Sequence, residues 1–121
     1  MIDHVGLEVT DLARAAGFYD AVLGRLGARR VVEGPGAIAY GVHEARLWIV
    51  ARGRTPGTAF GHVALRAAGR AAVDAAHAAG LDAGGRDDGP PGRRPAYGPR
   101  YYAGYLRDPD GHRVEVVAAG H

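Results

Sequence analysis

Cysteine, lysine, serine, asparagine and glutamine are all missing from the 121 residues of this chain. The lack of cysteine excludes disulfides, thiolate nucleophiles and cysteine-ligated zinc, and leaves histidine and carboxylate side chains as candidate metal ligands. No apolar run approaches the ~18 residues of a membrane span, and the first residues have neither the basic region nor the apolar segment of a secretory signal. We therefore expect a cytoplasmic protein without a membrane partner.

A strong net charge is also lacking. Fifteen basic residues, all of them arginine, accompany 13 acidic ones and are scattered from Arg14 to Arg113, so the formal net charge is only +2. Because no basic stripe results, nucleic acid is not an expected partner. Hydrophobic residues make up 47% of the chain, enough for one compact core but not for two independent ones. We expect a single domain over residues 1–121.

The chain contains an internal repeat. Residues 4–9 and 62–67 share the pattern His-Val-small-Leu-charged-apolar, and they begin 58 residues apart, at residues 4 and 62. A helical pattern follows each segment. Asp11 is placed to cap the first helix, which ends near Gly24 or Gly27, and the second helix runs from Arg70 to Ala79 with Gly80 just past its end.

Strand patterns follow both helices. They cover residues 28–32, 37–41, 45–51, 101–107 and 113–118. Residues 84–100, between the second helix and the last two strands, are rich in glycine and proline and allow one short edge strand at most. The sequence thus predicts an α+β fold of two β-α-β-β-β modules, about residues 1–56 and 57–121, related by a pseudo-twofold axis.

Strand alternation predicts which side chains share a face. His4, His62 and Glu115 all point away from the face that packs on the helix of their module. If the pseudo-twofold axis brings the open faces together, two imidazoles and one carboxylate meet in one cavity. This set suits Fe(II), Mn(II) or related divalent ions and leaves positions for water, substrate or O₂. Trp48 occupies the place equivalent to Glu115 and is a candidate apolar wall for the substrate.

The turn Asp108-Pro109-Asp110-Gly111 sets the register of the last hairpin. A type I turn with Gly111 in the left-handed region creates a bulge, which pairs Asp108 with His112 and places Tyr105 opposite Glu115. Tyr105 is therefore a candidate hydrogen-bond partner for Glu115 or a substrate oxygen, and Tyr101 shares its face.

The glycine-rich segment has two interpretations. It is either a surface loop or a lid that brings Arg93, Arg94 or Tyr97 over a pocket, with Arg94 a candidate substrate-binding residue. His77, His112 and His121 are interpreted as structural or exposed.

Three sequence features resemble the vicinal oxygen chelate superfamily, which includes glyoxalase I, extradiol dioxygenases, fosfomycin resistance transferases and bleomycin resistance proteins. They are the two His-Val strand starts with Thr10-Asp11-Leu12, the segment Phe18-Tyr19 followed by Val22-Leu23-Gly24, and the run from Asp108 to Glu115. The resemblance covers the whole chain. It implies the glyoxalase/bleomycin resistance/dioxygenase-like fold and metal ligands at His4, His62 and Glu115.

Two functions stay open on this resemblance. The first is a metal-dependent enzyme (lyase, isomerase or ring-cleaving dioxygenase) that binds a small molecule through vicinal oxygens, with Fe, Mn, Ni, Zn or Co as the divalent metal. The second is a non-catalytic protein that sequesters an antibiotic, as bleomycin resistance proteins do. Trp48 stands where metal-dependent glyoxalase I supplies a fourth ligand, which argues against lactoylglutathione lyase activity. We expect a homodimer, since proteins of this fold commonly pair and the sheet edges are long.

Overall fold

The first module is a four-stranded sheet with one helix. The computed structural model describes residues 1–57 and 60–120. The elements of this module are β1 (Val5–Val9), α1 (Leu12–Gly24), β2 (Arg29–Glu33), β3 (Ala37–Gly41) and β4 (Leu47–Ala51). The strand order is β1-β4-β3-β2, with β1 parallel to β4 and the other pairs antiparallel. Asp11 caps α1 as predicted, because its side chain accepts a hydrogen bond from the Arg14 backbone N–H at 3.0 Å.

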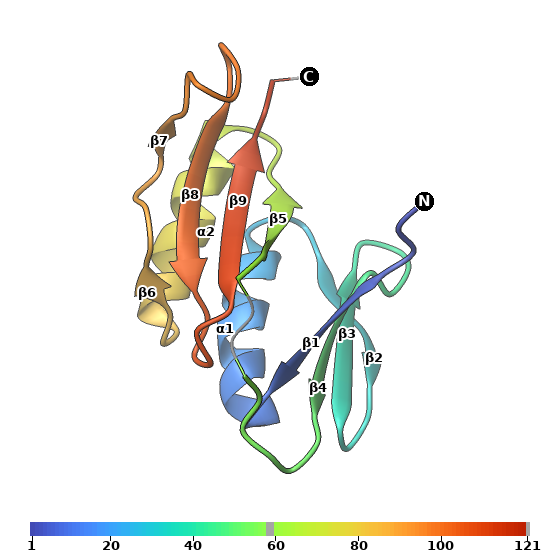
Figure 1. Cartoon of the computed structure of the whole chain (residues 1–121). Coiled ribbons are helices and arrows are strands. Elements are labelled where there is room, and N and C mark those ends of the chain that lie inside the picture. Colours follow the sequence, from blue (N-terminus) through green and yellow to red (C-terminus); the bar gives the residue numbers. More distant parts are fainter. Residues whose placement is uncertain (58–59, 121) are drawn as a thin grey trace.

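The second module repeats this plan with a longer connection. Its elements are β5 (His62–Arg66), α2 (Arg70–Asp82), β6 (Arg86–Asp87), β7 (Gly92–Arg93), β8 (Tyr102–Arg107) and β9 (Arg113–Ala118). The order is β5-β9-β8-β6, with β7 also paired to β8 and β5 parallel to β9. The α+β fold of two β-α-β-β-β modules is confirmed (Figure 1). Residues 84–100 form two short strands on β8, where at most one was predicted.

The second helix corrects one prediction. It extends to Asp82 and does not end at Ala79, and Gly80 lies buried inside it. A Cβ at Gly80 would lie only 2.6 Å from Leu106 Cδ1 and 2.9 Å from Val22 Cγ2, so this glycine permits close packing between elements. The left-handed glycine after the helix is Gly84, with φ +97°.

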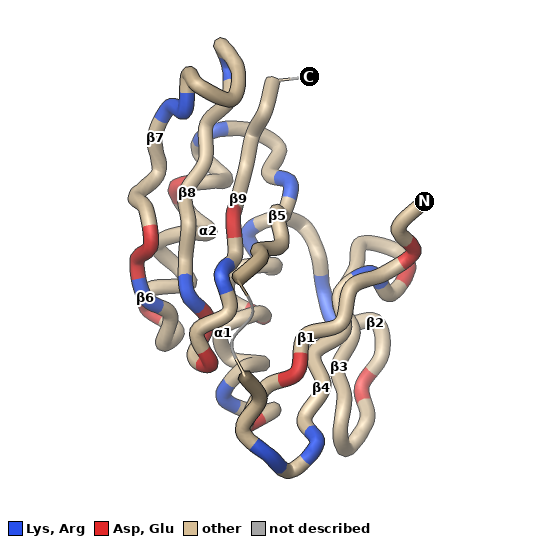
Figure 2. Tube along the Cα trace, in the orientation of Figure 1, with Lys and Arg blue, Asp and Glu red and all other residues tan. Residues whose placement is uncertain are grey.

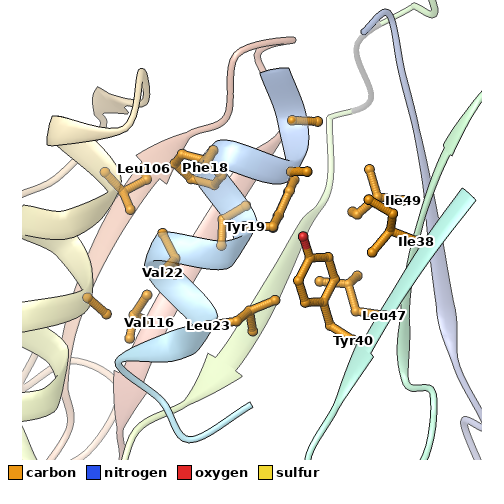
Figure 3. Close-up of a cluster of buried hydrophobic side chains, with 14 of the residues drawn as sticks. Phe18, Tyr19, Val22, Leu23, Ile38, Tyr40, Leu47, Ile49, Leu106 and Val116 are labelled. Carbon is orange, nitrogen blue, oxygen red and sulfur yellow. The ribbon is translucent and has the colours of Figure 1, made fainter. Parts of the chain in front are cut away.

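Helix α1 contributes to the core of both modules. Figure 3 shows Phe18 and Val22 pointing toward Leu106 and Val116 of the second module, whereas Tyr19 and Leu23 point toward the β3 and β4 side chains of the first. The modules therefore pack through their helices. The edge strands β1 and β5 do not pair with each other, and each is paired on one side only within the described residues.

The turn between β8 and β9 docks onto the first module. Gly111 has φ +90° and Tyr105 pairs with Glu115, so both the predicted bulge and the predicted register are confirmed. Asp108, 1% exposed, accepts a hydrogen bond from the Tyr19 hydroxyl at 2.6 Å. His112 Nε2 donates to the Glu8 carbonyl oxygen at 2.7 Å. The run from Asp108 to Glu115 thus joins the two modules at its turn.

Neither helix of the described residues has the length or hydrophobicity that crossing a bilayer would require.

Candidate metal centre

Glu115 and His62 meet on the open face of the second sheet. Glu115 lies on β9 and is 2% exposed, because the sheet and its neighbours on that face enclose it. His62 opens β5, the strand next to β9, and its Nε2 lies 3.0 Å from Glu115 Oε1. Tyr101, just before β8, donates its hydroxyl to Glu115 Oε2. Tyr105 was the predicted hydrogen-bond partner of Glu115, but Tyr101 makes this hydrogen bond, and Tyr105 lies opposite Glu115 in the neighbouring strand.

These side chains line a cavity of about 420 Å³. This volume falls within the range of small-molecule sites. Three tyrosines, Tyr97, Tyr101 and Tyr105, form much of its wall. The rings of Tyr97 and Tyr101 meet edge to face at 5.4 Å between centroids, and those of His62 and Tyr105 at 6.1 Å. The wall therefore offers aromatic faces and hydroxyl groups to a bound molecule.

Two of these phenols are held in their neutral form. The pKa of Tyr101 is raised by its hydrogen bond to Glu115, then by burial and by the charge of the Glu115 carboxylate. Burial and then the charge of Glu115 raise the pKa of Tyr105. Both hydroxyls are neutral hydrogen-bond donors at about pH 7, as an unperturbed tyrosine also is, and the raised pKa values keep them so at more alkaline pH.

Two arginines complete the cavity. Arg113 lies 4.0 Å from the centroid of the Tyr105 ring, and its Nε is 2.8 Å from Asp88 Oδ2. Hydrogen bonding from Arg113 and the charge of Arg107 lower the pKa of Asp88. Arg94, predicted to bind substrate, does line the cavity, and its Nη2 donates to the carbonyl oxygens of Pro90 and Ala103 at 2.7 and 3.3 Å.

His4 and Trp48 do not line this cavity. The His4 ring nitrogen Nδ1 lies 2.7 Å from Asp3 Oδ1, and its side chain is 54% exposed. Trp48 is half-buried on β4 and pairs with Gly6, just as Glu115 pairs with Ala64 in the repeat. Both residues belong to the first module, which meets the second through the helices. No cluster of three potential metal ligands exists within residues 1–57 and 60–120.

Three residues that line the cavity, Asp88, Gly89 and Arg113, were not predicted from the sequence. Arg113 could have been found, because strand alternation puts it on the same face as Glu115. Asp88 lies between β6 and β7, in a segment with no periodic pattern. The other histidines have different surroundings: His77 is buried with its Nε2 3.0 Å from Asp87 Oδ1, His43 is exposed, and His121 lies outside the described residues.

The side chains of His62 and Glu115 supply two of the three ligands that were predicted for a divalent cation. Glu115 is buried, yet no arginine in the described part of the chain lies within ion-pair distance of it. A buried carboxylate without a permanent cationic partner is costly, and a metal ion would offset that cost. One chain brings together a carboxylate and an imidazole, while the third predicted ligand lies on the other module.

Two β-α-β-β-β modules, with an imidazole and a buried carboxylate on the open sheet face of the second, define the structural class of this chain. The chain belongs to the Glyoxalase/Bleomycin resistance protein/Dioxygenase superfamily, whose family model matches residues 1–116.

Solved structures agree with this assignment. A glyoxalase/bleomycin resistance protein from Albidiferax ferrireducens is 34% identical, with 94% of each chain covered and a TM-score of 0.80. The fosfomycin resistance protein FosX from Mesorhizobium loti is 19% identical over 98% of this chain and 91% of its own, with a TM-score of 0.71. Lactoylglutathione lyase from Agrobacterium tumefaciens is 23% identical over 97% and 92%, with a TM-score of 0.68. The search of curated proteins found no match.

Proposed function

We propose that this protein is a cytoplasmic, metal-dependent enzyme that acts on a small molecule with two neighbouring oxygen atoms. Its reaction class is that of a lyase, an isomerase or a ring-cleaving dioxygenase. The observation that carries the proposal is the buried Glu115 in contact with His62 inside a cavity lined by tyrosines. Members of the superfamily usually bind a divalent metal and a small-molecule substrate.

The proposed third ligand is His4 of a second copy of the chain. Within one chain, the helices separate the open faces of the two sheets, so His4 does not meet His62. Dimers are common in the superfamily, and a symmetric dimer can place the first module of one copy over the second module of the other. Trp48 of that copy would then be placed to wall the cavity.

The residues of the cavity have separate roles in this proposal. His62 and Glu115 would hold the metal with His4 of a second copy, and the chemistry supplied there would be Lewis-acid stabilisation of negative charge on the substrate oxygens. Tyr101 orients Glu115 through its hydroxyl. Tyr105 and Arg94 face the substrate, as a neutral donor and as a cation respectively.

The test is elemental analysis of protein purified without added metal. We expect stoichiometric divalent metal in the wild type and loss of nearly all of it in His4→Ala, His62→Ala and Glu115→Ala. His43→Ala is the matched control, since His43 is exposed and lies outside the cavity. Equal, negligible metal in all five proteins would contradict the proposal. An aerobic assay with a catechol and Fe(II) then separates a dioxygenase from a lyase.

The second candidate function is sequestration of an antibiotic without catalysis. The observation in its favour is the aromatic wall, because Tyr97, Tyr101 and Tyr105 offer stacking surface to a planar ligand whether or not a metal is bound. Equilibrium binding of bleomycin to metal-free protein, unaffected by His62→Ala, would support this function over the enzymatic one.

A further inference from the structure

A second cavity, of about 690 Å³, lies at the end of the second sheet where β5 and β9 finish and β8 begins. Arg66, Arg70 and Arg100 contribute to its lining, and no acidic residue among residues 1–57 and 60–120 does. Figure 2 shows basic positions at this end of the sheet. The cavity is larger than the one around Glu115, and apart from Tyr101 none of its lining residues has a role in the proposed reaction.

Arg66, Arg70 and Arg100 are exposed, and their guanidinium groups have no carboxylate partner within ion-pair distance in the part of the chain that the structure describes. Arg107 and Arg113, on the same sheet, both pair with Asp88. Arg70 and Arg100 also contact neighbouring residues, Arg70 through its guanidinium and Arg100 through its aliphatic stem. The Arg70 guanidinium lies 5.1 Å from the centroid of the Tyr102 ring. The Arg100 side chain lies so close to Gly120 that a Cβ there would be 2.5 Å from Arg100 Cβ.

The arginine-lined cavity is adjacent to the candidate metal centre. On β5, Ala64 pairs with Glu115, and Arg66 pairs with Val117 two residues further along. Residues two apart in a strand share a face and are separated by about 7 Å, so Arg66 lies on the face of Glu115. Tyr101 lines both cavities and donates to Glu115. A ligand at Glu115 could therefore extend past Tyr101 to the arginines.

We propose that the arginine-lined cavity binds the anionic group, a carboxylate or a phosphate, of a molecule whose chelating oxygens occupy the neighbouring centre. This inference rests on the proposed function, because it assigns a substrate class to the same site. Guanidinium groups bind both kinds of anion through paired, charge-assisted hydrogen bonds. The substrate is thus a small acid whose charged end lies roughly 7 Å or more from its chelating end.

The test is isothermal titration calorimetry on the full-length protein at constant ionic strength, with inorganic pyrophosphate and succinate as separate probes. We expect the wild type to bind at least one probe, and the double variant Arg66→Gln/Arg100→Gln to bind it at least about tenfold more weakly. Arg86→Gln is the matched control, because Arg86 is exposed on β6 and lies outside both cavities. A stronger response to pyrophosphate identifies a phosphate ligand, and a stronger response to succinate a carboxylate.

Failure of this inference can be told apart from failure of the proposed function. Metal content is measured on the same preparations, and His62→Ala is expected to lose metal while it keeps its affinity for the anion. If neither probe binds, or if Arg86→Gln weakens binding as much as the double variant, the arginine-lined cavity is not an anion site. If the anion binds but wild-type protein holds no metal, the proposed metal function is wrong and the anion site remains.

Discussion

At the scale of single residues, two helical glycines have opposite surroundings. A Cβ at Gly80 in α2 would collide with the side chains of Leu106 and Val22, whereas a Cβ at Gly17 in α1 would meet nothing within 4 Å. We expect Gly80→Ala to lower the free energy of unfolding by roughly 1–3 kcal/mol through overpacking. Gly17→Ala is the control, and we expect it to be neutral or stabilising by up to about 1 kcal/mol, because alanine favours the helix. Urea denaturation of both variants measures the difference, and equal effects would mean that α1 and α2 are not packed tightly at Gly80.

At the scale of elements, sequence patterns predicted local structure better than they predicted how distant elements pack on each other. Turn chemistry gave the bulge at Gly111, and the register that this bulge sets gave the pairing of Tyr105 with Glu115, because both depend on neighbours in the chain. The contact of Asp108 with Tyr19 joins residues 89 positions apart, and no periodic pattern encodes such a contact. The same limit explains why Gly80 was predicted as a helix end, since only the packing of α1 shows its role.

This docking contact also predicts how stability depends on alkaline pH. Burial and then the charge of Asp108 raise the pKa of Tyr19 well above 10. In the unfolded chain the phenol ionises near pH 10, so its contribution to stability is complete below that pH and is lost as the pH rises above it. We expect the free energy of unfolding to fall as the pH rises above about 10. The fall should be less steep in Tyr19→Phe, and the two slopes should differ by at most about 1.4 kcal/mol per pH unit.

Urea denaturation between pH 8 and 12 measures these slopes. The matched control is Tyr97→Phe, at a position that is 68% exposed, and it should keep the wild-type slope. At pH 8 the loss of the hydroxyl in Tyr19→Phe should itself cost about 1–3 kcal/mol, since the buried Asp108 loses a donor. A slope in Tyr19→Phe as steep as that of the wild type would show that Tyr19 ionises equally in the folded and unfolded states.

At the scale of the whole molecule, the repeat predicted two similar modules but not how they are joined. Equivalent positions in a repeat meet around a pseudo-twofold axis only if the modules associate through the matching faces. Here α1 fills the core between the sheets, so the faces that carry His4 and Glu115 are not brought together within one chain. The edge strands β1 and β5, through which the two sheets could associate in that way, are each paired on one side only in the described residues.

A site shared between two copies makes a quantitative prediction for mixed dimers. We expect His4→Ala and Glu115→Ala each to lose metal when present alone. In a mixed dimer, however, one site receives an intact His4 from the second variant and intact His62 and Glu115 from the first. Random pairing of equal amounts, by refolding the two together, should therefore restore about a quarter of the wild-type metal content, because half of the dimers are mixed and each has one complete site. If the wild type binds metal and the mixture binds none, each site draws all its ligands from one chain, and the shared arrangement is wrong.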